Sequence, residues 1–94
     1  MEKKPTEQAL KKQKNLLNRV NRVEGQIKGI KNMIEKGVYC DDIINQIEAS
    51  RSALNSIEII LLENHIKSCV KERIQKGDDE IIEEVLKTIK RLTK

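Results

Sequence analysis

Three residues of the sequence could bind a soft metal ion or react through sulfur: the two cysteines and the single histidine. His65 and Cys69 lie four positions apart in the segment ENHIKSC, which is about one helical turn. On a helix, their side chains would share one face within reach of a single ion. The other cysteine, Cys40, lies 29 positions before Cys69 in the segment GVYCDD. A site of all three residues therefore requires two distant segments to meet.

The two cysteines cannot meet within one straight helix. No proline or glycine lies between Cys40 and Lys76, so we expect a helix over about this range that Gly77 ends. The two thiols would then be ~43 Å apart. If two copies of the helix pair antiparallel, Cys40 of one chain approaches His65 and Cys69 of its partner, and two-fold symmetry creates two such sites. The alternative is that all three residues are structural, at a helix start, a core edge and an apolar groove.

Two thiolates and one imidazole would form a soft ligand set. Soft sulfur ligands select Cu(I), zinc or iron–sulfur chemistry. A structural zinc site normally has four protein ligands, and an iron–sulfur cluster generally has four cysteines. If the three residues form a site, they therefore suit three-coordinate Cu(I) best. Nickel or cobalt would need more nitrogen or oxygen donors than one histidine supplies.

Three helices are expected to carry these residues, so the fold class is all-α. The first is expected from Thr6, which can cap its start, to about Lys36, and Gly37 ends it. The second is the long helix described above. The third is expected from about Asp79 to Leu92, where apolar residues recur at helical spacing.

The middle of the second helix is too apolar to be covered by its own chain. Seven of the ten residues from Ala53 to Leu62 are apolar, a wider face than one neighbouring helix covers. A rod on the order of 54 Å long also exceeds what a compact chain of this length can bury. We therefore expect an obligate oligomer of paired long helices, larger than a dimer. A monomeric helical hairpin is the alternative.

The excess of positive charge lies in the first third of the chain. Residues 1–36 carry 10 Lys or Arg against 4 Asp or Glu, a net charge of +6, while residues 37–76 and 77–94 each carry −1. A basic helix face is the electrostatic pattern of a protein that binds a phosphate backbone. The alternative is a solvated face that aids solubility. Because the chain has one aromatic residue, base stacking on single-stranded targets is disfavoured.

Several classes of protein are excluded. No apolar run approaches the roughly 18 residues of a membrane span, and the N-terminal segment lacks the apolar region of a signal peptide. We therefore expect a cytoplasmic protein with one domain, residues 1–94, of which residues 1–5 are disordered. In that compartment the cysteines are thiols or ligands rather than a disulfide. No acid–base pair or activated nucleophile indicates an enzyme.

Two segments resemble a known family: NRVNRVEGQIKGIKNMIEKGVYCDDIINQI and ALNSIEIILLENHIKSCV. They are similar to the copper-sensitive operon repressor (CsoR) family of bacterial transcription regulators, the metal-sensing repressors of the CsoR/RcnR type. The resemblance covers residues from about Leu16 to Leu92. Its specific motifs are the Tyr-Cys pair, the later His-x3-Cys and an R-x2-R-x-E-G-Q segment.

This resemblance implies a fold and a function. The fold is an antiparallel helical dimer that pairs again into a tetramer. The function is that of a Cu(I)-responsive repressor that binds double-stranded operator DNA when metal-free and leaves it when Cu(I) binds. Carried onto this sequence, the Cu(I) ligands are Cys40 from one protomer with His65 and Cys69 from the other.

The resemblance also implies residues around the ligands. Tyr39 and Glu84 match positions that hydrogen-bond the far nitrogen of the ligand histidine, which would fix its tautomer and orientation. Glu83 is an alternative to Glu84, because the length of the preceding KGDD loop varies in the family. Without the resemblance, Tyr39 and Glu84 would be interpreted as surface residues.

The basic first helix supplies most candidates for DNA contact. Arg19 and Arg22 lie in the family-like segment, and Arg51 on the second helix is a further candidate. Other residues that add to the positive field are Lys11, Lys12, Lys14, Lys28 and Lys31.

Two other functions remain open. Family members that sense persulfide or sulfane sulfur use two cysteines and generally lack the histidine, so His65 favours copper. Cys40 and Cys69 could nevertheless link through sulfane sulfur. Family members that sense nickel or cobalt use extra histidines, which this chain lacks. The last alternative is a metal-independent helical DNA-binding oligomer in which both cysteines are incidental.

Overall fold

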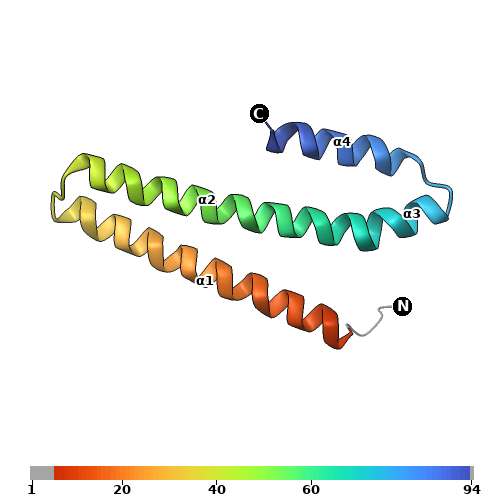
Figure 1. The fold of residues 1–94 in the computed structure, drawn as a ribbon, viewed down its shortest axis with the longest axis horizontal. Coiled ribbons are helices and arrows are strands. Elements are labelled where there is room, and N and C mark those ends of the chain that lie inside the picture. The colour runs from red at the N-terminus through yellow and green to blue at the C-terminus, as the bar shows by residue number, and fades with distance from the viewer. Residues whose placement is uncertain (1–5, 94) are drawn as a thin grey trace. The chain divides into compact units, whose positions relative to one another are not determined.

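The computed structural model describes residues 6–93, and every regular element within that range is helical. The elements are α1 (Glu7–Glu35), α2 (Cys40–His65), the π-helix η1 (Ile66–Val70), α3 (Lys71–Gln75) and α4 (Glu80–Leu92) (Figure 1). Because α2, η1 and α3 follow one another directly, the three expected helical segments and the all-α class are confirmed. No helix of the described range is long and apolar enough to cross a membrane. Residues 1–5, expected to be disordered, lie outside the described residues.

The ends of α1 follow its sequence signals. The side-chain oxygen of Thr6 accepts a hydrogen bond of 3.1 Å from the Ala9 N–H, as an N-cap does. At the other end, Gly37 has a φ of +66°, a left-handed conformation that glycine adopts without steric cost. Its N–H bonds back to the Ile34 carbonyl at 3.1 Å. The predicted cap and the predicted stop are both confirmed.

The second helical segment differs from the uninterrupted α-helix that we expected. Residues Ile66–Val70 form a π-helix, in which hydrogen bonds reach one residue further along the chain than in an α-helix. No proline or glycine lies in this stretch, so no local signal in the sequence predicts the change. The segment ends before Gly77, whose φ of +85° matches the predicted stop.

The first compact unit of the chain, Met1–Glu58, pairs α1 with the first part of α2 (Figure 1). Its buried apolar side chains include Val23 on α1 and Ile57 on α2, which are 8% and 7% exposed. The Ser50 hydroxyl on α2 donates a hydrogen bond of 2.9 Å to Gln26 Oε1 on α1. Apolar contact and one polar contact therefore hold α1 against α2.

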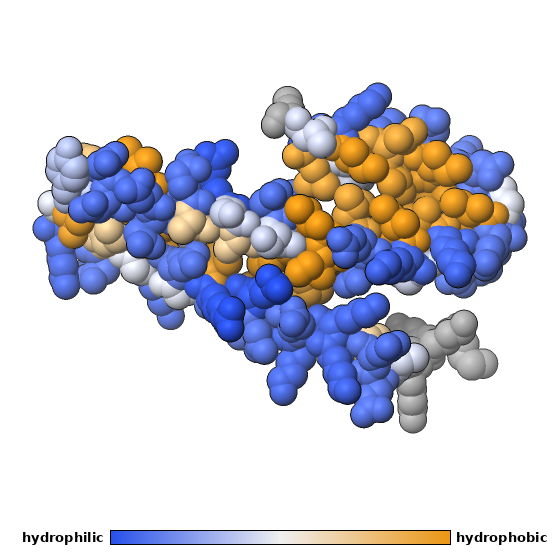
Figure 2. Space-filling view, viewed as in Figure 1, coloured by the Kyte–Doolittle hydropathy of each residue, from blue (hydrophilic) through white to orange (hydrophobic). Residues whose placement is uncertain are grey.

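The second compact unit, Ile59–Lys94, folds α4 back along the helical segment that contains η1 and α3 (Figure 1). Val70 is 6% exposed and Ile81 is completely buried, so these two residues centre its core. On the face drawn in Figure 2, hydrophobic side chains gather over this unit. The unit contains His65 and Cys69, and α4 packs on the segment that carries them.

Large apolar side chains remain exposed on every long helix. Leu17 and Ile34 on α1 are 54% and 60% exposed, Leu61 on α2 is 52% exposed, and Leu86 on α4 is 45% exposed. A soluble monomer rarely leaves so much apolar surface in contact with water. This surface is available for contact with other chains.

Candidate functional site

Cys40 is the first residue of α2 and follows Tyr39. The Tyr39 carbonyl accepts the N–H groups of Asp42 and Ile43 at 3.0 and 3.3 Å, which starts the helical hydrogen-bond pattern. The Cys40 thiol is free and exposed, and the Tyr39 residue is 73% exposed. A thiol at an exposed helix end is accessible to donors from a second chain.

His65 is the last residue of α2, and Cys69 lies inside η1. His65 is half-buried, whereas Cys69 is exposed and its thiol is free. The Ser68 hydroxyl donates to the Asn64 carbonyl at 2.6 Å and lies 3.8 Å from Cys69 Sγ. The four-residue spacing still places His65 and Cys69 about one turn apart. Single π-helical turns occur frequently at functional sites, and η1 begins directly after His65 and contains Cys69.

Within one chain the structure does not bring the three candidate ligands together. Cys40 and His65 are the two ends of α2, and an α-helix of 26 residues is about 39 Å long. In residues 6–93 no group of three or more His, Cys, Asp or Glu side chains could hold a metal ion. His65 and Cys69 lie together near the end of α2, whereas Cys40 lies at its start.

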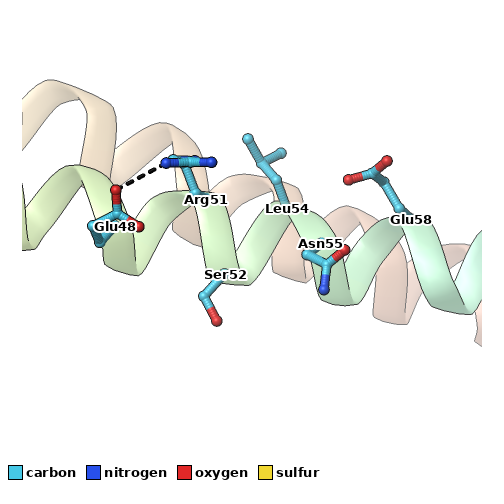
Figure 3. A pocket seen from close by; sticks show the side chains of 6 residues that line it. All are labelled: Glu48, Arg51, Ser52, Leu54, Asn55 and Glu58. Atoms are coloured by element: carbon cyan, nitrogen blue, oxygen red, sulfur yellow. Dashed lines mark hydrogen bonds and ion pairs between the residues drawn. The ribbon is translucent and has the colours of Figure 1, made fainter. Parts of the chain in front are cut away.

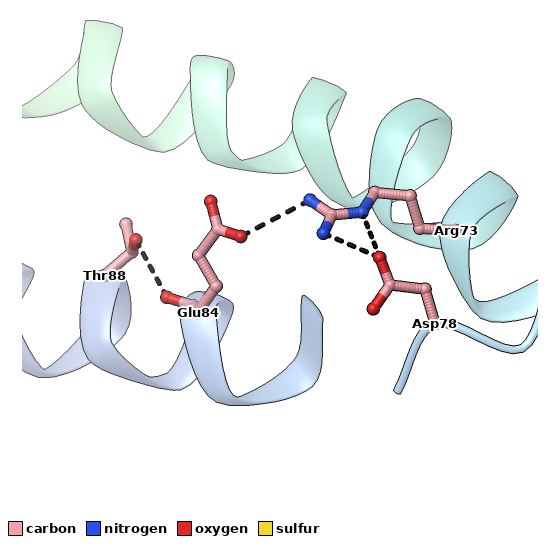
Figure 4. Close-up of polar contacts among 4 residues, drawn as sticks. All are labelled: Arg73, Asp78, Glu84 and Thr88. Atoms are coloured by element: carbon pink, nitrogen blue, oxygen red, sulfur yellow. Dashed lines mark hydrogen bonds and ion pairs between the residues drawn. The ribbon is translucent and has the colours of Figure 1, made fainter. Parts of the chain in front are cut away.

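Glu84, on α4, is held by Arg73 at the end of the preceding helical segment. Arg73 Nη1 lies 3.4 Å from Glu84 Oε2 (Figure 4). Arg73 Nη2 and Nε also contact Asp78 Oδ2, at 2.7 and 2.8 Å. The hydrogen bond to Asp78 is the main reason why the pKa of Arg73 is raised above its ordinary value. Arg73 therefore joins α3 both to the turn at Asp78 and to α4.

The candidate DNA-binding arginines lie exposed on the unit formed by α1 and the first part of α2. Arg19 Nε donates to Asn15 Oδ1, one turn earlier on α1, at 3.0 Å, and Arg22 is exposed on the same helix. The Arg51 side chain is 72% exposed, and its guanidinium pairs with Glu48 at 2.9 Å (Figure 3). All three guanidinium groups are thus accessible, but a carboxylate already contacts that of Arg51.

Arg51 borders a shallow hollow of about 430 Å³ on α2 (Figure 3). The residues that line it are Glu48, Arg51, Ser52, Leu54, Asn55 and Glu58. Because two carboxylates face one guanidinium, the hollow is unfavourable for an anion. It is therefore not a phosphate pocket, and any phosphate contact of Arg51 must compete with Glu48.

Comparison with known proteins places this geometry in a family. Residues 12–91 match the family model described as metal-sensitive transcriptional repressor. The chain belongs to this family. The copper-sensing transcriptional repressor CsoR of Bacillus subtilis (strain 168) is 42% identical over 85 residues, which are 89% of this chain and 84% of that protein. The copper-sensing transcriptional repressor RicR of Mycobacterium tuberculosis is 44% identical over 63 residues, 67% of this chain and 66% of that protein.

Solved structures of metal-responsive regulators share the fold of this metal-sensitive repressor. The crystal structure of the copper-sensing repressor CsoR with Cu(I) from Geobacillus thermodenitrificans NG80-2 matches with a TM-score of 0.83 and 35% identity, covering 100% of this chain and 95% of that chain. The nickel-responsive transcriptional regulator InrS matches with a TM-score of 0.72 and 28% identity, covering 84% and 90%. The CsoR-like fold expected from the sequence is confirmed.

The family also fixes the class of function. A metal-sensitive transcriptional repressor regulates transcription and is not an enzyme, as the sequence predicted. A transcriptional repressor acts by binding operator DNA, so DNA is a partner of this chain. The prediction of the family from the Tyr-Cys and His-x3-Cys motifs is likewise confirmed.

One contact of this repressor that we did not predict is that between Arg73 and Glu84. A signal for it exists in the sequence, because Arg73 follows Cys69 by four positions, as Cys69 follows His65. Residues at such steps share one helix face. Arg73 therefore lies on the same helix face as His65 and Cys69.

A second unpredicted contact joins Gln26 to Ser50. Gln26 lies between Val23 and Ile30 at three- and four-residue steps, so it occupies a position in the apolar stripe of α1. A polar residue in such a stripe needs a polar partner when it is buried. Which residue of α2 supplies that partner depends on the pairing of the two helices, which the sequence pattern does not specify.

Proposed function

We propose that this metal-sensitive repressor responds to Cu(I), binding operator DNA when metal-free and releasing it when Cu(I) is bound. The observation that carries the proposal is the donor set: two free, exposed thiols and one imidazole, at the two ends of α2 and in η1. Such soft donors fit Cu(I) and are too poor in nitrogen and oxygen for nickel. Relatives described as copper-sensing support the same metal.

Cys40 of one protomer would hold the ion together with His65 and Cys69 of its partner. This arrangement needs α2 helices that pair antiparallel, because α2 carries its donors at opposite ends. When bound, the ion supplies a cross-link between the two protomers. Glu84 and Tyr39 would hydrogen-bond the far nitrogen of His65 and fix the tautomer of the ring.

The oligomer would be a dimer that pairs again into a tetramer, with each chain folded as one domain. The exposed apolar side chains of α1, α2 and α4 support this proposal, since they need a cover that one chain does not supply. In particular, Leu54 and Leu61, in the apolar stretch of α2, are 46% and 52% exposed.

Operator binding would use Arg19, Arg22 and Arg51 on backbone phosphates of double-stranded DNA. All three are exposed, and residues 1–36, which include Arg19 and Arg22, carry a net charge of +6. Since most of the affinity of such contacts comes from counterion release, we expect binding to weaken steeply with salt. A repressor works where the DNA is, so we place the protein in the cytoplasm.

A second candidate is a repressor that senses persulfide or sulfane sulfur. It is favoured by one observation, namely that both thiols are free and exposed. Cys40 of one protomer and Cys69 of its partner would then be linked through sulfur, and His65 would have no direct role.

An anaerobic DNA-binding titration distinguishes these functions. The full chain is titrated against an operator selected from a random duplex library, alone and with Cu(I), Ni(II) or polysulfide. We expect Cu(I) to lower operator affinity by a factor of about 5 to 150, the usual range of allosteric coupling. Loss of affinity with polysulfide and not with Cu(I) would support the sulfur sensor instead. No response to any of the three would indicate a metal-independent DNA-binding oligomer.

A further inference from the structure

Arg73 lies on the series of residues that carries the candidate metal donors. His65, Cys69 and Arg73 follow one another at four-residue steps through the end of α2, η1 and α3. Four-residue steps place side chains roughly one above the other on a helix. The contact between Arg73 and Glu84 therefore brings a carboxylate of α4 to the end of this series.

The geometry of the contact leaves one Glu84 oxygen available. Arg73 Nη1 contacts Glu84 Oε2 at 3.4 Å, while Asp78 Oδ2 engages the Nε and Nη2 of the same guanidinium. In Figure 4 the other Glu84 oxygen points away from Arg73, toward the helical stretch that precedes Arg73. Because the guanidinium is planar and Asp78 fixes one edge of it, the direction of its contact with Glu84 is set from outside α4.

We propose that Arg73 is a positioning residue of the metal-signalling site, which holds one oxygen of Glu84 so that the other faces the series with His65 and Cys69. The inference rests on the proposed function, in which Glu84 accepts a hydrogen bond from His65. An exposed glutamate samples many rotamers, and Arg73 restricts them before the histidine engages. Lysine would serve less well, because it lacks the planar fork that holds two carboxylates at once.

A purely structural role would have a different signature. The side chains of Arg73, Asp78 and Glu84 are 43%, 38% and 60% exposed, and ion pairs at such sites add little to stability. Replacing Arg73 should therefore leave the protein folded. Its effect should appear in the response to metal and not in the unfolding transition.

The test uses the full chain with Arg73→Gln and a matched control, Lys76→Gln. Lys76 directly follows the last residue of α3, and its replacement by glutamine removes the same charge as Arg73→Gln. The ion pair of Lys76, with Glu72 at 3.2 Å, does not involve α4. Operator affinity is measured anaerobically without and with Cu(I), and Cu(I) affinity by competition with a chelator. For Arg73→Gln we expect the ratio of the two operator affinities to fall roughly three- to tenfold, within the usual range of allosteric coupling. The operator affinity of the metal-free protein should stay within about twofold, and Arg73→Lys should restore part of the ratio.

His65 gives a second readout, because it is the only histidine of the chain and its ring signals in NMR need no assignment. Arg73→Gln should shift these signals at constant pH, whereas Lys76→Gln should leave them as in the wild type. Unchanged ring signals together with a full wild-type ratio in Arg73→Gln would overturn the proposal while the copper response stands. A wild-type protein whose operator affinity ignores Cu(I) would instead overturn the proposed function, and with it this role of Arg73.

Discussion

The Ser50 hydroxyl on α2 donates a 2.9 Å hydrogen bond to Gln26 on α1, and Ser50 is the buried polar residue of the described part of the chain. The same hydroxyl lies 3.2 Å from the Gln46 carbonyl, so two acceptors share its one proton. Apolar contacts allow two helices to slide, but a directional bond favours one register. Arg22 lies one turn before Gln26 and Arg51 follows Ser50, so this register also spaces two candidate DNA contacts.

Replacing Ser50 by alanine should therefore destabilise the protein and weaken operator binding. We expect the free energy of unfolding to fall by about 1–2 kcal/mol, because the bond is lost and Gln26 keeps a half-buried oxygen without its donor. Urea unfolding at one fixed protein concentration measures the effect. Ser56→Ala is the control, since the Ser56 hydroxyl is exposed and bonds only the Ser52 carbonyl at 3.3 Å. Equal losses in the two variants would show that the bond to Gln26 has no special role.

The proposed cross-chain metal site predicts that two inactive variants complement each other. Cys40→Ala chains and His65→Ala/Cys69→Ala chains should each bind Cu(I) weakly alone. After subunit exchange at equal amounts, half of the dimers contain one chain of each kind, and each of these has one intact site. High-affinity Cu(I) binding should then recover to about a quarter of the wild-type capacity, as two-fold symmetry requires. Absence of any recovery would mean that the three residues do not form one site across two chains.

The double change Arg19→Gln/Arg22→Gln should weaken operator binding and lower its dependence on salt. Each phosphate contact that is lost should reduce the slope of log affinity against log salt by roughly 0.9. The measurement is operator affinity at several salt concentrations. A control with the same charge change is Lys87→Gln/Lys90→Gln on α4, which should keep the wild-type slope. If the arginine variant keeps the wild-type slope of log affinity against log salt, Arg19 and Arg22 of α1 do not contact DNA phosphates.

Glu48→Gln should strengthen operator binding, because Glu48 occupies the Arg51 guanidinium at 2.9 Å. Freeing an exposed arginine from such a pair should raise affinity by about 1.4- to 5-fold, the strength of one surface ion pair. Glu72→Gln frees Lys76 on the other unit with the same change in charge and serves as control. Weaker binding by the Glu48 variant would mean that the carboxylate orients Arg51 for DNA and does not compete with it.

His65→Ala should weaken the coupling between metal and DNA more than it weakens metal binding. Two thiolates can hold Cu(I) without the imidazole, but the hydrogen bond to Glu84 on α4 would be lost. An effector shifts an equilibrium only through its different affinities for the two states. The measurement is the ratio of operator affinities without and with Cu(I), beside the Cu(I) affinity itself. If His65→Ala keeps the wild-type ratio of operator affinities, His65 only binds the metal and does not transmit its presence to the DNA-binding surface.

Much of the fold was predictable because its boundaries depend on local chemistry. Thr6 caps α1 through a neighbouring N–H, and Gly37 and Gly77 adopt positive φ where the helices end. The π-helix at Ile66–Val70 was not predictable, because it contains neither proline nor glycine. Val70, the last residue of this π-helix, is 6% exposed, so the segment lies where the chain is packed.

The candidate site stays a prediction, as a set of residues and as a geometry. The spacing of His65 and Cys69 predicts two donors on one face, but the proposed third donor, Cys40, would depend on how a second chain pairs, which one sequence does not encode locally. The contact of Arg73 with Glu84 likewise depends on how the turn returns α4 to the preceding segment. Long-range contacts of this kind are set by tertiary structure, and periodicity alone does not identify them.

The exposed apolar residues of the single chain have a consequence for the cell that makes it. Leu17, Ile34, Leu61 and Leu86 are each 45–60% exposed, so a newly synthesised chain would be vulnerable to proteases and aggregation until copies cover one another in the proposed oligomer. If the regulator works as this oligomer, its assembly depends on concentration, and the amount of working regulator falls faster than the number of chains. We expect a daughter cell that inherits few chains at division to transcribe the controlled genes briefly, without any metal signal, until synthesis restores assembly.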